Sequence, residues 1–439
     1  MLVGVGVGIA ELAAGPQAPS APPSGFAVQP DISDPLCNGG RGVRLRARFA
    51  GDSVVADGTM ADGSTVIALS EIYPGKSSAV LYSVTRECVP NRAFGNTGAA
   101  RIAISASRTH PAPAPLGVPP AAGVLWVQTV AARRGGGAIV AGTYGDDWVV
   151  GEVTQRGQLD STFGNGGWTV LPYHGGVTAV VQEPSGRIVV GGDNGGGGCC
   201  TLNWVAAVSA RGRLENRFGT HGREELPTGE DSGVDSLALE PNGDILAAVG
   251  YGNMGCWGVA LAMLTPSGRP VPLFAQRLAQ FWQRLGFGAF VGDAYVSGAG
   301  FTLAGTGQRP CAGAPSFSAP SATGLITRFR ADGEPVSRPI RFPSRLYGTV
   351  QAFRDRGDTL VVDAPYADQT QFTVTARRSD GSVDPRFGNH GHAQIHTPWT
   401  GRNAALGTAV AIAQAGPGEM LVIATESGLS QLQIIRVRL

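Results

Sequence analysis

The sequence is poor in lysine, in net charge and in long apolar runs. Lys76 is the only lysine, and 34 basic residues against 33 acidic ones leave a formal net charge of +1, with no dense basic cluster. We therefore expect neither nucleic acid nor an anionic membrane surface as a partner. Beyond the N-terminus, no run is long and apolar enough to cross a bilayer, so we predict no membrane span.

Signatures of catalysis and metal binding are also scarce. Serine, histidine and aspartate occur without a Gly-x-Ser-x-Gly nucleophile elbow. His392 and His396 are four positions apart on an expected strand, about 13 Å, which is too far for one metal ion. The glycines of residues 4–8 precede no βαβ unit and are no dinucleotide loop. We predict no catalytic residue, no metal and no cofactor.

The N-terminal residues follow the order of a secretory signal without its positively charged start. Residues 2–10 are apolar, residues 13–15 are small, and a Pro/Ala/Ser stretch continues to Pro23. A truncated or miscalled signal peptide and a flexible tail both remain open. We assign residues 1–32 to this segment and residues 33–439 to a single domain, and we expect a monomer that is secreted or displayed on a bacterial cell surface.

What the sequence does contain is internal repetition. Among 66 glycines and 30 prolines, a turn glycine recurs at Gly186, Gly243, Gly300 and Gly357, in steps of 57 residues. The same turn occurs at irregular steps at three further glycines, Gly63, Gly136 and Gly418. The chain therefore contains seven copies of one unit.

Short apolar runs around each turn predict β-strands. Residues 177–181 precede Gly186 and residues 187–191 follow it, which is typical of a hairpin. A third strand, such as 203–208, follows a variable loop, and a fourth follows a connector. Such units bury both faces when they are arranged radially. We predict an all-β fold, a seven-bladed β-propeller of four-stranded antiparallel blades.

The two ends of the chain complement one another. The last unit stops after its third strand, residues 431–439, whereas residues 43–49 form a strand that precedes the first turn glycine. We therefore predict that strand 43–49 completes the C-terminal blade and closes the ring.

A connector motif, Asp-x-x-Phe-Gly-Asn-x-Gly, lies between the third and fourth strands. Its copies are residues 159–167, 214–222 and 383–391, with a looser copy at 89–98. The motif resembles the delta-60 repeat of bacterial proteins, many of them exported, from about Asp34 to the C-terminus. It is degraded at residues 266–274, where no glycine follows the phenylalanine, and at 331–336, which lack Phe-Gly. The resemblance implies an architecture rather than an activity.

The repeated residues have structural roles to fill. Glycine adopts positive φ at a turn without a Cβ penalty, and Asn91, Asp160 and Asp384 can accept hydrogen bonds from N–H groups two residues ahead. We expect the motif phenylalanines to anchor the connector on the sheet edge. They are Phe94, Phe163, Phe218 and Phe387.

The loops can be assigned to two faces of the expected ring. Loops between second and third strands and between blades share one face, which we call the loop face, and the hairpins and connectors share the hairpin face. The loop face is long and varied, and it carries aromatic rings, carboxylates and amides, Asp193 and Asn194 among them, which suit a sugar or peptide although they are also ordinary loop composition. The candidate ligand-binding residues are Tyr144, Asp146, Asp147, Trp148, Tyr173, His174, Tyr251, Trp257, Tyr347, Trp399 and Arg402.

Six cysteines suit an oxidising compartment if the protein is exported. Cys256 lies on the loop face and could pair there with Cys199, Cys200 or Cys311. Cys37 and Cys88 fall in the connectors of the last and first blades, where a disulfide would hold the ring closed. Buried free thiols remain the alternative.

Two classes of function remain. The first is an exported, non-catalytic propeller that binds a protein, glycan or envelope partner through its loop face. The alternative is a secreted hydrolase or lyase with acidic residues at the mouth of the central channel. Two carboxylates within about 5–10 Å of each other beneath an open pocket would favour the enzyme.

Overall fold

The computed structural model describes a little more than two thirds of the chain. The described residues are 28–31, 42–46, 53–60, 63–70, 78–85, 87, 89–104, 123–195, 202–226, 233–253, 256–285, 289–296, 300–308, 322–336, 338–344, 349–355, 358–364, 371–378, 382–387, 389–396, 408–416, 419–425 and 431–438.

The described chain is all-β apart from one helix, and its strands form seven antiparallel sheets. The first three sheets, each from its innermost strand outwards, are β3 (Ser53–Thr59), β4 (Thr65–Ser70), β5 (Ser78–Val84) and β6 (Ala99–Ala103); β7 (Leu125–Ala132), β8 (Ala138–Tyr144), β9 (Asp147–Val153) and β10 (Trp168–His174); and β11 (Val177–Gln182), β12 (Ile188–Asp193), β13 (Asn203–Val208) and β14 (Arg223–Leu226). The next three are β15 (Val234–Leu239), β16 (Ile245–Asn253) and β17 (Cys256–Leu264); β18 (Ala289–Val296), β19 (Gly300–Gln308), β20 (Ala322–Arg330) and β21 (Ile340–Ser344); and β22 (Thr349–Asp355), β23 (Asp358–Ala364), β24 (Gln371–Arg377) and β25 (His392–His396).

The last sheet contains both ends of the described chain. It consists of β26 (Thr408–Gly416), β27 (Glu419–Thr425), β28 (Gln431–Arg438), β2 (Gly42–Arg46) and β1 (Val28–Asp31). The N-terminal strand expected over residues 43–49 is present as β2, and Val43 lies opposite Ile434 of β28. β1 lies inside the segment that the sequence assigns to a signal or a tail, and it pairs with β2.

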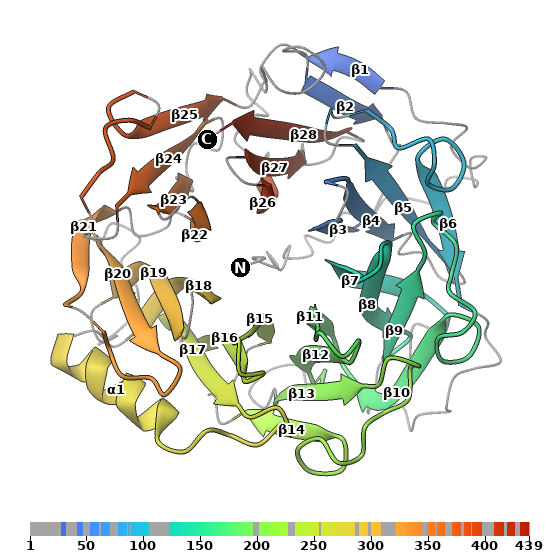
Figure 1. Ribbon diagram of the computed structural model, residues 1–439, viewed down its shortest axis with the longest axis horizontal. Helices are drawn as coiled ribbons and strands as arrows, with labels where there is room; N and C mark the ends of the chain where they lie inside the picture. The colour runs from blue at the N-terminus through green and yellow to red at the C-terminus, as the bar shows by residue number, and fades with distance from the viewer. Residues whose placement is uncertain are drawn as a thin grey trace.

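The sheets are arranged radially about a common centre (Figure 1). The innermost strands touch in sequence, β3 with β7, β7 with β11, β11 with β15, β15 with β18 and β18 with β22, while β26 touches β3. The prediction of an all-β fold built from antiparallel four-stranded sheets is confirmed for most of the sheets.

Neighbouring sheets share their hydrophobic cores. Ile139 and Val140 are adjacent on β8 and are both fully buried, yet Ile139 packs towards β11–β14 and Val140 towards β3–β6. Successive side chains of a strand point to opposite faces, so a strand covered on both faces must be apolar throughout. This explains why the second strands appear in the sequence as unbroken apolar runs.

The connector motif has the local structure that its residues indicate. The N–H groups of Ala93, Thr162 and Arg386 donate to the side-chain oxygens of Asn91, Asp160 and Asp384, at 3.2, 3.0 and 3.0 Å. Phe94, Phe163 and Phe218 are buried, and Phe387 is half-buried. The predicted turn and the predicted anchor are therefore confirmed.

The connector also bonds to the next sheet, which its sequence did not reveal. The N–H of Gly95 donates to the carbonyl of Arg156 at 2.9 Å, and the N–H of Gly164 donates to that of Arg211 at 2.9 Å. A third such bond joins Gly219 to Ser267 at 2.8 Å. The motif therefore joins two sheets rather than covering the edge of one.

The sheet β15–β17 differs from the predicted four strands. In the described residues it has three, and helix α1 (Phe274–Leu285) follows the connector at the outer rim (Figure 1). Phe274, Leu278 and Phe281 recur at helical spacing and pack between this sheet and β18–β21. Gly219 has φ 52° at the position that Ala275 occupies here, and alanine in a left-handed conformation is costly. Loss of that glycine favours continuing the chain as a helix.

Candidate functional site

Three successive innermost strands carry a β-bulge near their starts. The register of β7 on β8 shifts between Val127 and Thr129, which leaves Gln128 outside the ladder. The corresponding shifts leave Thr178 of β11 and Asp235 of β15 outside their ladders. A bulge redirects a side chain, and Gln128 and Thr178 are directed towards the next sheet, whereas the Asp235 carboxylate lies beside Gly250 of its own sheet.

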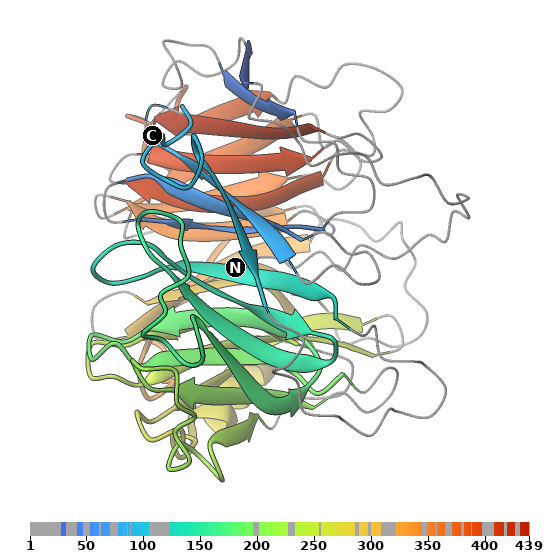
Figure 2. The same cartoon turned by 90° about the vertical axis from the view of Figure 1, so that its right-hand side faces the viewer.

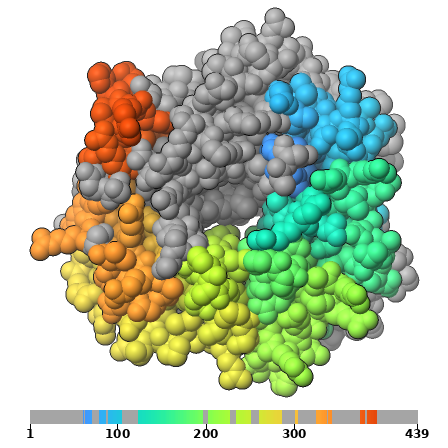
Figure 3. All heavy atoms as spheres, in the orientation of Figure 1, coloured from blue at the N-terminus to red at the C-terminus, as the bar shows by residue number. Residues whose placement is uncertain are grey.

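Gln128 and Thr178 each bond to the next innermost strand. The space-filling view shows an opening near the centre of the array, bordered in part by the green β7–β14 region (Figure 3). Gln128 Oε1 accepts a hydrogen bond from the N–H of Val177 at 2.9 Å. Thr178 Oγ1 donates to the carbonyl of Val234 at 2.6 Å. These bonds hold neighbouring innermost strands together beside the opening.

Asp193, the last residue of β12, presents one carboxylate oxygen at this place. Its Oδ1 accepts hydrogen bonds from the N–H groups of Gly195 at 2.7 Å and Gly176 at 3.3 Å. Its Oδ2 has no hydrogen-bond partner among the described residues. Burial raises the pKa of the Asp193 carboxyl, and the two backbone hydrogen bonds oppose that rise. The backbone hydrogen bonds to Oδ1 therefore fix the carboxylate in place, while Oδ2 can accept a hydrogen bond from a ligand.

Glycine leaves the approach to this oxygen open. A Cβ placed on Gly176 would lie 3.1 Å from Asp193 Oδ2 and 3.0 Å from Gln128 Nε2. The carboxylate oxygen and the Gln128 amide therefore border the same small space. An acceptor beside an amide that both donates and accepts is suited to a hydroxyl-bearing ligand.

An imidazole and a second carboxylate lie at neighbouring strand ends, His174 at the end of β10 and Asp147 at the start of β9. His174 Nδ1 lies 3.2 Å from Asp147 Oδ1; Asp147 is buried, whereas His174 is half exposed. The N–H of Gly175 donates to the carbonyl of Asp146 at 3.0 Å, which fixes the chain between His174 and Gly176. We refer to Gln128, Asp147, His174 and Asp193 as the mouth cluster.

An exposed indole lies on the same strand as Gln128. Trp126 is 37% exposed, and it is the only aromatic ring among the large apolar side chains that are exposed in the described part of the chain. It lies near the loop-face end of β7, two residues before Gln128. An exposed ring close to polar groups is a common arrangement for sugar recognition.

Several predicted binding residues lie beneath this surface. Tyr144, Trp148 and Tyr173 are buried at 5% exposure or less, and the Trp148 and Tyr173 rings meet edge-on at 5.6 Å. Trp148 Nε1 donates to the carbonyl of Asp193 at 3.1 Å. Trp148, packed against Tyr173, therefore holds Asp193 in place, while His174 and the half-buried Asp146 remain accessible.

The other predicted residues are described in part or not at all. Tyr251 lies on β16, and Trp257 and Cys256 lie on β17, with Cys256 opposite Asn253; the side chains of all three are outside the description. The remaining candidates lie outside the described residues: Tyr347, Trp399, Arg402, Cys37, Cys88, Cys199, Cys200 and Cys311.

Two residues of the site were missed by the sequence. Trp126 and Gln128 belong to a strand rather than to a loop, and a bulge leaves no mark in the residue pattern of one strand. A signal does exist between strands, because Thr178 and Asp235 are one 57-residue step apart and are both polar in otherwise apolar runs. Comparing the repeats column by column would have singled out this position.

The described part of the chain contains neither a candidate metal site nor a candidate membrane-spanning helix. No group of three or more His, Cys, Asp or Glu side chains there could hold a metal ion. In the same residues, no helix combines the length and apolar character needed to cross a membrane.

Comparison with known proteins gives similarity of structure only. No family model matches the sequence, and no curated protein is similar to it. Among solved structures, the polysaccharide lyase Uly1 shares 10% identity over 90% of this chain and 92% of its own, with a TM-score of 0.49. The Dos1 propeller shares 9% identity over 88% and 92%, with a TM-score of 0.44. A neuraminidase-like protein of A/little yellow-shouldered bat shares 10% over 94% and 98%, with a TM-score of 0.39.

Proposed function

We propose that this chain is an exported, non-catalytic β-propeller that binds a glycan through the mouth cluster on its loop face. In this proposal the seven sheets are the blades of one ring, closed where β2 pairs with β28, and the units belong to the delta-60 repeat class. The observation that carries the binding proposal is Asp193, whose Oδ1 is fixed by two backbone N–H groups while its Oδ2 has no partner.

The chemistry of the cluster favours a sugar. Asp193 Oδ2 accepts a hydrogen bond, the Gln128 amide can donate and accept, and the exposed Trp126 ring offers an apolar face. Neighbouring hydroxyls on one edge of a pyranose need such paired donors and acceptors, and its C–H face packs on an aromatic ring.

A second candidate is a hydrolase or lyase at the same mouth. It is favoured by the raised pKa of Asp193, which suits a proton donor, and by the His174–Asp147 pair beside it. The two candidates differ in whether a bound glycan is altered.

A glycan array separates these possibilities. We expect purified protein to retain a subset of neutral glycans and Asp193→Asn to bind them at least about 10-fold more weakly, as for loss of a hydrogen bond to a charged group. Glu225→Gln, at an exposed carboxylate of β14, is the matched control and should bind normally. Equal binding by Asp193→Asn would contradict the proposal, and release of shorter or unsaturated sugars from the retained glycans would identify the enzyme instead.

The proposed ring closure has its own test. A Cys37–Cys88 disulfide would link the connectors of the first and last blades, and it stays a prediction. Peptide mass mapping of the exported protein without reduction should find the two cysteines in one linked peptide. Finding both as free thiols would contradict the disulfide.

A further inference from the structure

Exposed arginines collect on the hairpin face, opposite the mouth cluster. They lie on the connectors and turns of three successive sheets, coloured from blue to green in Figure 2. We call them the arginine arc: Arg92, Arg156, Arg211, Arg213 and Arg217.

The joints between sheets determine the order of the arc. Arg156 and Arg211 occupy the same turn position, and each carbonyl accepts the N–H of the preceding connector, from Gly95 and Gly164 respectively. Arg92 lies on the first connector, and Arg213 and Arg217 lie on the third unit. Each of these two joints therefore places an arginine of one sheet next to the connector of the preceding sheet.

The charge of the arc is not neutralised within the described protein. None of its five guanidinium groups forms an ion pair with a described residue. Four carboxylates on this face are instead bound to two other arginines. Arg133 pairs with Glu152 at 2.9 Å and Asp160 at 2.6 Å, and Arg187 pairs with Glu183 and with Glu215. Because those acids are already paired, the five exposed arginines give the rim a positive field.

We propose that the arginine arc binds a linear anionic polysaccharide. A guanidinium group is a planar fork that matches a carboxylate or a sulfate with two parallel hydrogen bonds. Arginines spread along a rim suit an extended polymer that carries acidic groups along its length, because separate sugars of one polymer can pair with guanidinium groups on different sheets. This surface is separate from the mouth cluster and would leave the loop face free.

Other polyanions fit this surface less well. Single-stranded nucleic acid is bound by stacking bases on aromatic side chains, and the arc includes none. The connectors of these three sheets expose one large apolar side chain in their described residues, Val89, which gives little to insert into a membrane. The arc can therefore form bidentate pairs between guanidinium and acidic groups but offers no base stacking and little membrane insertion, which favours the polysaccharide.

The fold explains why the arginine arc cannot be recognised from the sequence alone. The five arginines are spread over residues 92–217, so no short segment of the sequence is strongly basic. A formal net charge of +1 for the whole chain conceals a face on which the acids are paired and the arginines are not.

Binding to sodium polygalacturonate, measured by calorimetry at low salt, tests the proposal. The variant Arg156→Ser/Arg211→Ser/Arg213→Ser keeps the backbone carbonyls of the joints and removes three guanidinium groups. We expect it to bind at least 30-fold more weakly than the unchanged protein, whose own affinity should fall steeply as salt is raised. Arg284→Ser, at an exposed arginine of α1 away from the arc, is the control and should bind normally.

Three outcomes would overturn the proposal. The first is unchanged binding by the triple variant, and the second is an equal loss in Arg284→Ser. The third is tighter binding of double-stranded DNA or of phosphatidylglycerol vesicles than of polygalacturonate, which would assign the surface to another partner. If the triple variant has a lowered thermal midpoint, the single variant Arg213→Ser replaces it, with a loss of at least 3-fold expected and an unchanged affinity contradicting the proposal.

Discussion

The sheets β11–β14 and β15–β17 are neighbours one repeat apart, yet they differ at the outer rim and at the hairpin. The first ends in strand β14, whereas the second has α1 after its connector. Their first hairpins begin at Glu183 and Glu240, which are 57 residues apart, and each has the sequence Glu-Pro-x-Gly. A comparison of these two hairpins shows how one substitution changes the electrostatics of a conserved backbone.

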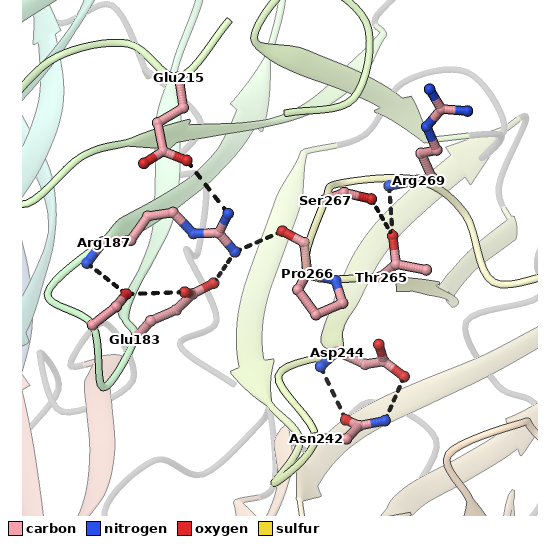
Figure 4. Close-up of polar contacts among 10 residues, drawn as sticks. Glu183, Arg187, Glu215, Asn242, Asp244, Thr265, Pro266, Ser267 and Arg269 are labelled. Carbon is pink, nitrogen blue, oxygen red and sulfur yellow. Dashed lines mark hydrogen bonds and ion pairs between the residues drawn. The ribbon is translucent and has the colours of Figure 1, made fainter. Parts of the chain in front are cut away.

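In the first hairpin an arginine satisfies the acids around it. Arg187 pairs with Glu183 and, at 3.4 Å, with Glu215, and it donates to the carbonyl of Pro266 in the next sheet at 2.6 Å (Figure 4). Pairing with both acids raises the pKa of Arg187 despite its burial. The network therefore stabilises the hairpin and its contact with β15–β17.

In the second hairpin the arginine is replaced by Asp244, which bonds to Asn242 (Figure 4). Both carboxylate oxygens of Glu240 are buried and have no hydrogen-bond partner among the described residues. Burial, and to a smaller extent the charge of Asp244, raises the pKa of Glu240 to about 7. The Glu183 carboxylate is ion-paired with Arg187, whereas the equivalent Glu240 carboxyl group in the next sheet is neutral below about pH 7.

The largest expected effect tests whether Phe218 and Phe274 stabilise their two connectors to the same extent. Phe218 and Phe274 are both buried, one before a glycine connector and one at the start of α1. Phe218→Ala and Phe274→Ala should each lower the free energy of unfolding by about 3–5 kcal/mol, as for buried aromatic residues in general. Urea titration measures the loss, and Leu273→Ala, at a side chain that is 58% exposed, is the control. A loss below about 1 kcal/mol for Phe274→Ala would show that the helix has taken over the anchoring.

The next-largest effect concerns the first hairpin, in which Arg187 is ion-paired. Arg187→Ala should cost about 3–4 kcal/mol at pH 7, because it leaves two carboxylates without their partner; Glu215 is partly exposed, so the cost lies low in the range for buried pairs. The cost should be smaller at pH 3, because acid weakens ionic interactions with carboxylates in general. Arg213→Ala, at an exposed arginine without an ion pair, should change stability little at either pH. A cost that does not depend on pH would rule out an ionic origin.

A third effect distinguishes the two hairpins by its sign. The pKa of Glu240 is raised on folding, so its contribution to stability is fully present below the unfolded pKa of about 4.3 and is lost as the pH rises through about 7. Glu240→Gln should therefore leave stability unchanged near pH 4 and increase it by about 3 kcal/mol at pH 8. Chemical unfolding at the two pH values measures this. A variant that is destabilised at pH 8 would show that the ionised carboxylate has a favourable partner.

The smallest effect would convert one hairpin into the other. Asp244→Arg introduces the residue type found at Arg187, and it should move the pKa of Glu240 down towards its ordinary value. Stability at pH 8 should rise by about 1 kcal/mol, with Asp244→Asn giving less. Proton titration of the Glu240 carboxyl by NMR would follow the change. A pKa that stays near 7 in Asp244→Arg would mean that burial alone controls this group.

The fold was readable from the sequence because its determinants are local and repeated. Gly63, Gly136, Gly186 and Gly243 all have positive φ, as their turn positions require. Gly300 lacks a positive φ and begins β19 instead. Such residues act through their own backbone, so one sequence is enough to recognise them.

The site was less readable because it depends on contacts between units. Trp148 and Tyr173 were expected at the surface, but packing between sheets buries them. Gln128 became important through a bulge and through its bond to Val177 in another sheet. Helix α1 lies where a glycine is missing from the motif, and composition alone gave no reason to expect a helix there.

The hydrogen bonds from Gly95, Gly164 and Gly219 to the following sheets have a consequence for how such a protein can change length in evolution. Each of these three connectors donates to the turn of the following unit, so these three junctions join a unit to its successor in the same way. Duplicating or deleting one complete unit would create a junction of the same kind as those already present. Gene duplication can therefore alter the number of units without inventing a new contact, and only the fit of the first unit to the last would limit it.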